Sequence, residues 1–188
     1  AAGIAPRRGS RRGGDRAAAG IAPRSDAARW SALADAIVAD VTADCTHPSG
    51  RWQRAPDDPR VDAALLTAAL RGALPADDSR SIATYTAVRE DLGRRGFVYR
   101  FRQDARALSD SEGAFLVCGF WMALAARQQG DDVAAAHWFE RARTACGPPG
   151  LFTEEYDIRQ RQLRGNLPQA FVHALMFEAS ARLAQDRP

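Results

Sequence analysis

The stretch GLFTEEYD, residues 150–157, places two adjacent glutamates, an aromatic residue and an aspartate in a connecting segment. Glycine and proline precede it at positions 147–150, and the charged segment runs on to Gly165. Carboxyl groups can act as general acids or general bases when they are positioned next to a reacting group. Adjacent glutamates in a loop are nevertheless more often solvated surface charges. The meaning of Glu154 and Glu155 therefore depends on the elements that surround them.

Those elements are predicted to be helices, because no convincing strand alternation occurs after residue 25. Helices that begin near residues 26, 79 and 131 carry one apolar stripe, which is typical of a surface helix. Three other segments are apolar on most sides, which is typical of an enclosed helix: 61–72, 112–130 and 167–184. The alternation predicts an all-α fold of three helical hairpins with an outer and an inner layer. The connector at 146–165 then lies at one end of the inner layer.

Two details of this prediction concern helix ends and stripes. We expect Asp26 to cap the first helix and Asn166 to cap the last one, with Pro168 in its first turn. The apolar stripe of the first helix is Trp30, Leu33, Ala34, Ile37, Val38 and Val41. The stripe of the helix near residue 79 is Ile82, Tyr85, Val88 and Leu92.

The N-terminal segment differs in composition from the rest of the chain. Residues 1–24 hold six arginines and one aspartate, which is a net charge of +5. The net charge of the whole chain is +3, so the remaining residues sum to −2. The heptapeptide AAGIAPR occurs twice in this segment, separated by a Gly/Arg-rich stretch. We predict a disordered tail at 1–25 and one globular domain at 26–188. Because the tail has no aromatic residue for base stacking, its arginines do not favour a nucleic-acid partner.

The remaining composition narrows the class of protein. The longest uncharged apolar run, 114–126, is too short to cross a membrane, so no membrane partner is expected. Three scattered cysteines predict no disulfide framework and favour a cytoplasmic location. The pair Cys45 and His47 lacks the further ligands that a structural zinc needs, and we expect neither a metal nor another cofactor. His173 is predicted to be a hydrogen-bonded core histidine.

Four blocks of the sequence resemble glycoside hydrolase family 15, the glucoamylases and related trehalases. They are LPADDSRSIATYTAVREDLGRRGFVYRFR, SEGAFLVCGFWMALA, GLFTEEYD and GNLPQAFVHALM, in the family's order. The resemblance implies an (α/α)6 toroid, of which three hairpins are about the C-terminal half. It also implies inverting hydrolysis of terminal α-glucosidic bonds in dextrin, isomaltose or trehalose, with an α-glucoside as the binding partner.

The resemblance assigns roles to three residues. Glu154, the first glutamate of TEEYD, matches the catalytic general base, and Glu155 is the second choice for that role. Arg100 in VYRFR matches an arginine that binds hydroxyls of the cleaved glucose, and its charge is suited to hold Glu154 ionised. An ordinary surface ion pair is the alternative for Arg100.

The chain also departs from the family's pattern. No glutamate follows a tryptophan, as the family's general acid usually does, and the segment before Trp30 is the arginine-rich tail. A base without its acid predicts little activity for this chain alone. The exposed flanks of a half-ring favour either self-association or a missing N-terminal half as partner.

A non-catalytic helical scaffold is the alternative function. The segment GDDVAAAHWFERARTA resembles the second part of a tetratricopeptide unit. Such an array repeats with a period near 34 residues, and comparison of the three hairpins shows no such period. Peptide binding without sugar binding would favour the scaffold.

Overall fold

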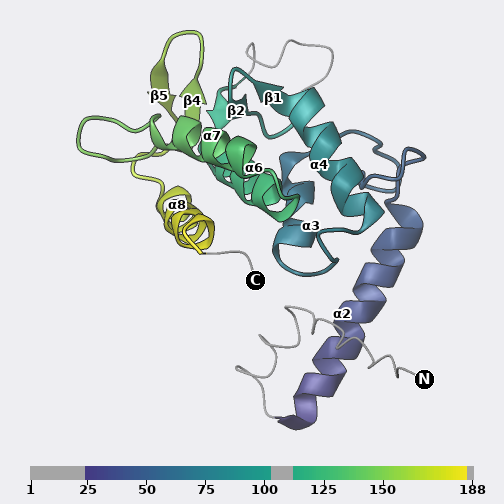
Figure 1. Cartoon of the computed structure of the whole chain (residues 1–188). Helices are drawn as coiled ribbons and strands as arrows, with labels where there is room; N and C mark the ends of the chain where they lie inside the picture. Colours follow the sequence, from purple (N-terminus) through teal and green to yellow (C-terminus); the bar gives the residue numbers. More distant parts are fainter. Residues whose placement is uncertain (1–23, 103–111, 186–188) are drawn as a thin grey trace, which may run out of the picture.

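The computed structural model describes residues 24–102 and 112–185, and most of these are helical (Figure 1). The helices are α2 (Arg24–Asp44), the 3₁₀ turn η1 (Ala63–Leu66), α3 (Thr67–Leu70), α4 (Ser79–Leu92), α6 (Leu116–Gln128), α7 (Asp132–Arg143) and α8 (Ala170–Leu183). The strands are β1 (Gly93–Arg94), β2 (Phe97–Val98), β3 (Ala114–Phe115), β4 (Glu155–Asp157) and β5 (Gln162–Arg164). Residues 1–23 of the tail predicted at 1–25 lie outside the described residues. Its last two residues, 24 and 25, belong to α2.

Helix α6 is the centre of the described core. Its residues are apolar around the whole circumference, and those from Leu116 to Ala126 are buried except for the half-buried Trp121. It packs against α7 on one side, α8 on another, and α3 and α4 on the remaining flank. Helix α7 buries one stripe, Ala135, Trp138 and Ala142, as the sequence predicts for an outer helix. The two-layer arrangement of hairpins is therefore confirmed around α6.

The segment at 61–72 does not form the single helix that its apolar pattern predicts. It folds as η1, which Asp62 caps by accepting a hydrogen bond from the Ala64 N–H at 2.8 Å, and then as the single turn α3. A continuous apolar run fits a short buried turn as well as a helix, so the pattern alone does not set the length. Helix α4 buries Tyr85, Val88 and Leu92 as predicted, but Ile82 is 44 % exposed.

Short strands, which the sequence analysis did not predict, build one end of the molecule. Strands β1 and β2 form a hairpin, and β3, β4 and β5 form an antiparallel sheet in that order. In Figure 1 both sheets lie at the end of the molecule opposite to the projecting half of α2. Strands of two or three residues are too short to show a period of two, so periodicity does not reveal them.

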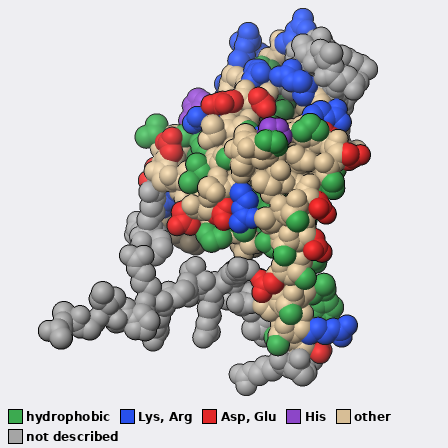
Figure 2. All heavy atoms as spheres, turned by 90° about the vertical axis from the view of Figure 1, so that its right-hand side faces the viewer, with side chains coloured by type: hydrophobic (Ala, Val, Ile, Leu, Met, Phe, Trp, Pro, Cys, Tyr) green, Lys and Arg blue, Asp and Glu red, His purple; other side chains and the backbone are tan. Residues whose placement is uncertain are grey.

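Helix α2 extends away from the body of the protein (Figure 1), and hydrophobic side chains lie exposed along it (Figure 2). Its predicted stripe exists, but Trp30 and Ile37 are 48 % and 54 % exposed. None of the buried hydrophobic residues in the described part of the chain belongs to α2. A hydrogen bond of 2.8 Å from the Arg80 guanidinium to Thr42 Oγ1 ties its last turns to α4.

Helix α8 is enclosed on one side only. It buries Val172, Leu175 and Ala179, whereas Phe171 and Phe177 are 50 % and 66 % exposed. The predicted cap is wrong, because α8 begins at Ala170, after Gln169, and the Asn166 side chain is engaged elsewhere. The predicted cap at Asp26 is also wrong, since this residue lies within the first turn of α2.

Candidate active site

The segment that carries the two glutamates is anchored in the core by Phe152, which is 3 % exposed. The Phe152 ring contacts Phe120 of α6 edge-on, with ring centroids 6.0 Å apart, and lies 5.1 Å from the imidazole of His173 on α8. The Phe152 N–H donates to His173 Nε2 at 3.2 Å, while His173 Nδ1 bonds the Gln169 carbonyl at 2.8 Å. His173 is therefore a hydrogen-bonded histidine at the edge of the core, and it fixes the start of the glutamate segment.

Glu154 is held at the N-terminal end of the central helix. Its carbonyl accepts a hydrogen bond of 3.1 Å from the N–H of Leu116, the first residue of α6. Its carboxylate Oε2 accepts one of 3.1 Å from the Asn166 side chain. Gly165 lies against it with a φ of +76°, and a Cβ there would come within 3.0 Å of the Glu154 Cβ. The side chain of the half-buried Glu154 is thus oriented by Gly165 and Asn166, which follow β5 on the other side of the hairpin.

Glu155, the first residue of β4, is held in a different way. Its Oε2 accepts a hydrogen bond of 2.8 Å from the backbone N–H of Gly113. A side chain does not fit at Gly113, because its Cβ would lie 2.9 Å from the Tyr156 carbonyl oxygen and 3.1 Å from the Glu155 Cβ. Glu155 pairs with Phe115 across the sheet. The carboxylate of Glu155 is therefore bound to the chain segment that leads into α6.

The remaining residues of TEEYD, Tyr156 and Asp157, shape the hairpin. The Tyr156 ring stacks on Phe97 of β2 at a centroid distance of 5.0 Å. The Asp157 carboxylate accepts hydrogen bonds from the backbone N–H groups of Gln160 and Arg159, and it pairs with Arg164 across the hairpin. These bonds and the arginine charge hold the pKa of Asp157 below its usual range.

Arg100 forms an ion pair with Asp62 rather than with Glu154 in the described part of the chain. Its Nε lies 3.0 Å from Asp62 Oδ1, and its side chain is 39 % exposed. The antiparallel bridge between Asp62 and Phe101 and the hydrogen bond from the Ala63 N–H to the Arg100 carbonyl fix its backbone. Its positive charge acts on the carboxyl of Glu112.

Glu112 is an acidic residue of this site that the sequence analysis did not single out. Burial raises the pKa of its carboxyl, the negative charge of Glu155 raises it further, and Arg100 opposes both effects. The charges of Glu155 and Arg100 thus both act on Glu112, which precedes the Gly113 N–H that bonds the Glu155 carboxylate. Glu112 stands in SEGAF, one of the four blocks that carry the family resemblance, and this was the available signal.

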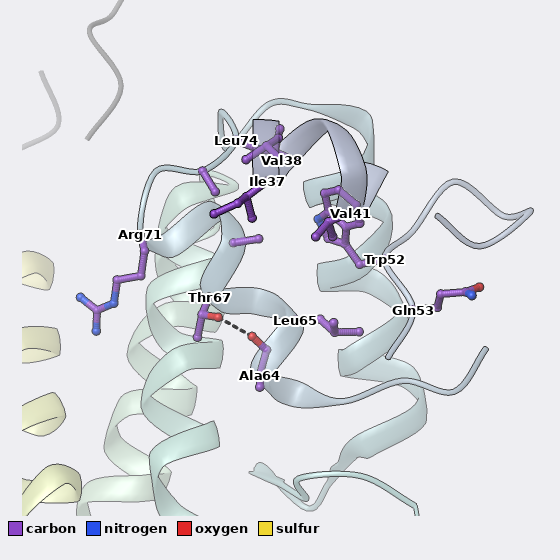
Figure 3. Close-up of a pocket in the computed structure, with 12 residues that line it drawn as sticks. Ile37, Val38, Val41, Trp52, Gln53, Ala64, Leu65, Thr67, Arg71 and Leu74 are labelled. Carbon is purple, nitrogen blue, oxygen red and sulfur yellow. Dashed lines mark hydrogen bonds between the residues drawn. The ribbon is translucent and has the colours of Figure 1, made fainter. Parts of the chain in front are cut away.

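An apolar cavity of the described residues lies elsewhere, between α2 and α3 (Figure 3). It has a volume of about 310 Å³ and is lined by Ile37, Val38 and Val41 of α2, together with Trp52, Leu65 and Leu74 among others. It contains none of the carboxylates described above, and its lining suits an apolar side chain better than a sugar. It is the recess beneath the exposed stripe of α2.

Other kinds of site have little support among the described residues. No group of three or more His, Cys, Asp or Glu side chains there is arranged to hold a metal ion. No helix in the described ranges has the length and apolar character that crossing a membrane requires.

Comparison with solved structures identifies the class of this fold. The chain superposes on a wild-type glycosidase with a TM-score of 0.77 over 92 % of its own length and 49 % of that chain, at 19 % identity. A glycosidase variant in complex with glucose gives a TM-score of 0.76 over 91 % of this chain and 48 % of its own. These likenesses show the fold of the chain, which is helical hairpins that form about half of an (α/α)6 toroid.

Sequence comparison identifies the family. The profile of glycosyl hydrolases family 15 matches residues 4–181. A trehalase of Mycolicibacterium smegmatis is 37 % identical over 158 residues, which are 83 % of this chain and 24 % of that protein. A trehalase of Thermoplasma acidophilum is 28 % identical over 84 % of this chain and 27 % of its own length. The chain belongs to glycoside hydrolase family 15, and it spans about a quarter of the length of these curated relatives. This membership does not support the helical-repeat alternative.

Proposed function

We propose that the chain carries the base-bearing half of an inverting α-glucosidase site, with Glu154 as the general base. The placement of Glu154 is the observation that supports this proposal. Its backbone is bonded to the first residue of α6 and its carboxylate to Asn166, so the oxygen that would take a proton from water is oriented before substrate binds. Glu155 is the second choice, because its Oε2 is already engaged by Gly113.

Inversion requires a water molecule between two carboxyl groups on opposite faces of the sugar, about 6.5–9.5 Å apart. Glu154 would remove a proton from this water as it attacks the anomeric carbon, while a general acid protonates the departing oxygen. We propose that this acid comes from outside the chain, since no glutamate here follows a tryptophan as the family's acid usually does. Arg100 would bind a hydroxyl of the same glucose through the guanidinium N–H groups that Asp62 does not occupy.

Trehalose is the α-glucoside that we propose to test first. The trehalases named above cover most of this chain at 28–37 % identity, and one structural neighbour holds glucose. Maltose and isomaltose remain as alternatives, because the contacts that distinguish them lie largely in the part of the toroid that this chain does not span. A cytoplasmic location is proposed as well, supported by the free thiols of Cys45, Cys118 and Cys146.

We also propose that further helical hairpins, from a second copy or from an N-terminal half, cover the two open edges of the half-ring. One edge is the stripe of α2 with the cavity beneath it, and the other is the outward face of α8 with Phe171 and Phe177. Exposed apolar surfaces of this kind usually mark an interface. Light scattering on the purified chain distinguishes the alternatives, because a monodisperse monomer would exclude self-association through these edges.

The experiment that tests the proposed reaction is a proton NMR time course with trehalose, maltose and isomaltose, in which the chain is combined with a separately produced N-terminal half that supplies the general acid. An inverting enzyme releases β-glucose first from the cleaved end, and Glu154→Gln should abolish its appearance. Glu90→Gln, an exposed glutamate of α4, is the matched control and should leave the rate unchanged. Release of α-glucose first, or an unchanged rate in Glu154→Gln, would contradict the assignment.

A further inference from the structure

Helix α2 presents an apolar face that is long enough to pair with a second helix. It has 21 residues, and Trp30, Leu33, Ile37 and Val41 of its stripe are all exposed. Its first half projects from the body of the protein, whereas its last turns adjoin α4 and the cavity above α3 (Figure 1). The two halves of the stripe therefore differ, because the cavity lies beside the second half.

This cavity has room for an aromatic side chain. Its volume is about 310 Å³, and Ile37 and Val41 of α2 face Leu74 across it (Figure 3). An apolar cavity of about 150 Å³ is enough to bind benzene. Arg71 also belongs to the lining, but its side chain points away from the cavity in Figure 3 and pairs with Glu178 of α8 at 2.7 Å. A ring that entered the cavity would therefore contact apolar groups.

Charged residues of α2 lie in a row along one flank of the stripe. At 3.6 residues per turn, Arg29, Asp40 and Asp44 fall within about 60° of one another around the helix axis. All three are exposed. Asp44 stands in the last turn, which has no basic residue, although a helix C-terminus disfavours negative charge. The acidic end of the row thus lacks a nearby cation within α2 itself.

We propose that α2 pairs in the antiparallel direction with α2 of a second copy of this chain, about a two-fold axis near the middle of the helix. In such a pair each flank faces the same flank of the other helix, so Arg29 of one copy lies beside Asp40 and Asp44 of the other. The two-fold axis repeats this contact. A parallel pair would place like charges side by side, which is why the charges favour the antiparallel direction.

The antiparallel register also fills the cavity. An axis between Asp35 and Ala36 places Trp30 of one copy opposite Val41 of the other, at the cavity. The projecting half of each helix then covers the second half of its counterpart. Tryptophan carries a large apolar area and is enriched among the residues that dominate binding energy at interfaces. One pair of helices is a small interface, so we expect a dimer that dissociates into folded monomers on dilution.

The association is tested by light scattering on the unaltered chain over a series of concentrations. We expect a dimer that dissociates on dilution and weakens with added salt. Arg29→Glu should weaken it about tenfold, because repulsion replaces attraction at two symmetry-related places. Arg89→Glu, at an exposed arginine of α4, makes the same change of charge and should leave the dissociation constant unchanged.

An exchange of charges tests the direction of the pair. Arg29→Asp combined with Asp40→Arg and Asp44→Arg reverses the row, and it should restore the dissociation constant to within about threefold of wild type. Trp30→Ala should weaken the dimer at least tenfold, or about 1.4 kcal/mol, because it leaves the cavity empty. Circular dichroism checks that each variant keeps its helices, as expected for substitutions at exposed positions.

The other possible results contradict the proposal. A monomer at every concentration would do so, and binding of that monomer to a separately produced N-terminal half would assign the α2 edge to that half. A dimer that Arg29→Glu leaves unchanged would be parallel or would use another surface, such as the outward face of α8. None of these measurements uses a sugar, so their outcome is independent of the proposed reaction.

Discussion

The two ends of this half-ring are built in opposite ways. At the carboxylate end, the glutamate segment is tied to α6, α8 and the preceding strand through Phe152, Leu116 and Gly113. At the other end, α2 extends from the body with its apolar stripe exposed, and Thr42 provides a bond to α4. The chain thus positions its proposed base through its own contacts, whereas its α2 edge has its apolar surface uncovered.

The largest difference between the two ends should appear when the core anchor of the site is removed. Phe152→Ala deletes a buried ring between α6 and α8 and should lower the free energy of unfolding by about 3–5 kcal/mol. Trp30→Ala on α2 removes a ring that is half exposed, and its cost should be well below this. Urea unfolding of the two variants measures both values, and equal losses would show that α2 is as well packed as the site.

Gly165→Ala sharpens the comparison within the site. The substitution strains a backbone at φ +76° and crowds the Glu154 side chain, so we expect a loss of about 1–3 kcal/mol in unfolding free energy. Gly150→Ala is the matched control, because it has the same φ and nothing within 4 Å of its Cβ position. If Gly165→Ala costs no more than Gly150→Ala, then the contact with Glu154 does not position the base.

A smaller effect is expected at the tip of the hairpin. The pKa of Asp157 is lowered by the backbone N–H groups of Gln160 and Arg159 and by the charge of Arg164. Its contribution to stability is therefore present above the unfolded-state pKa of about 3.9, and it is lost as the pH falls through the lower folded-state value. Asp157→Asn should melt at a lower temperature than wild type at pH 7. This gap should narrow towards pH 2, and a constant gap in thermal melts would contradict the assignment.

The smallest effect on the isolated chain should come from the α2 stripe. Ile37→Ser changes a side chain that is 54 % exposed, so the unfolding free energy should change by less than about 0.5 kcal/mol. The same substitution should abolish association with whatever covers this edge, as measured by light scattering. Ala39→Ser, at an exposed position outside the stripe, should affect neither property. Association that survives Ile37→Ser would place the interface elsewhere.

The sequence predicted the parts of the fold that have long, regular patterns. The enclosed character of α6 follows from its apolar circumference, and α7 buries the stripe that its pattern predicts. The cap at Asn166 was wrong because this side chain bonds Glu154 across the hairpin, which no local pattern indicates. The apolar stripe of α2 was predicted correctly. A sequence pattern does not show, however, whether another part of the protein covers that stripe.

The site was predictable to a similar extent. Glu154 and Glu155 were found because they stand in a family motif, and their roles stay predictions. Glu112 was missed because its environment depends on pairing between β3 and β4, which lie about forty residues apart in the chain and leave no periodic signal. The partner of Arg100 also comes from a distant segment, since Asp62 lies 38 residues earlier.

The anchoring of Phe152 has a consequence for how an active assembly would form. Because the ring and its backbone N–H are already bound within this chain, the glutamate segment need not become ordered when the other half of the ring arrives. Association of the two halves would then be the docking of two preformed surfaces and not folding coupled to binding. Its rate constant would be about 10⁵–10⁷ M⁻¹s⁻¹, as is typical of such docking. The rate of complementation by a separately produced N-terminal half would accordingly be limited by collision and orientation at α2 and α8.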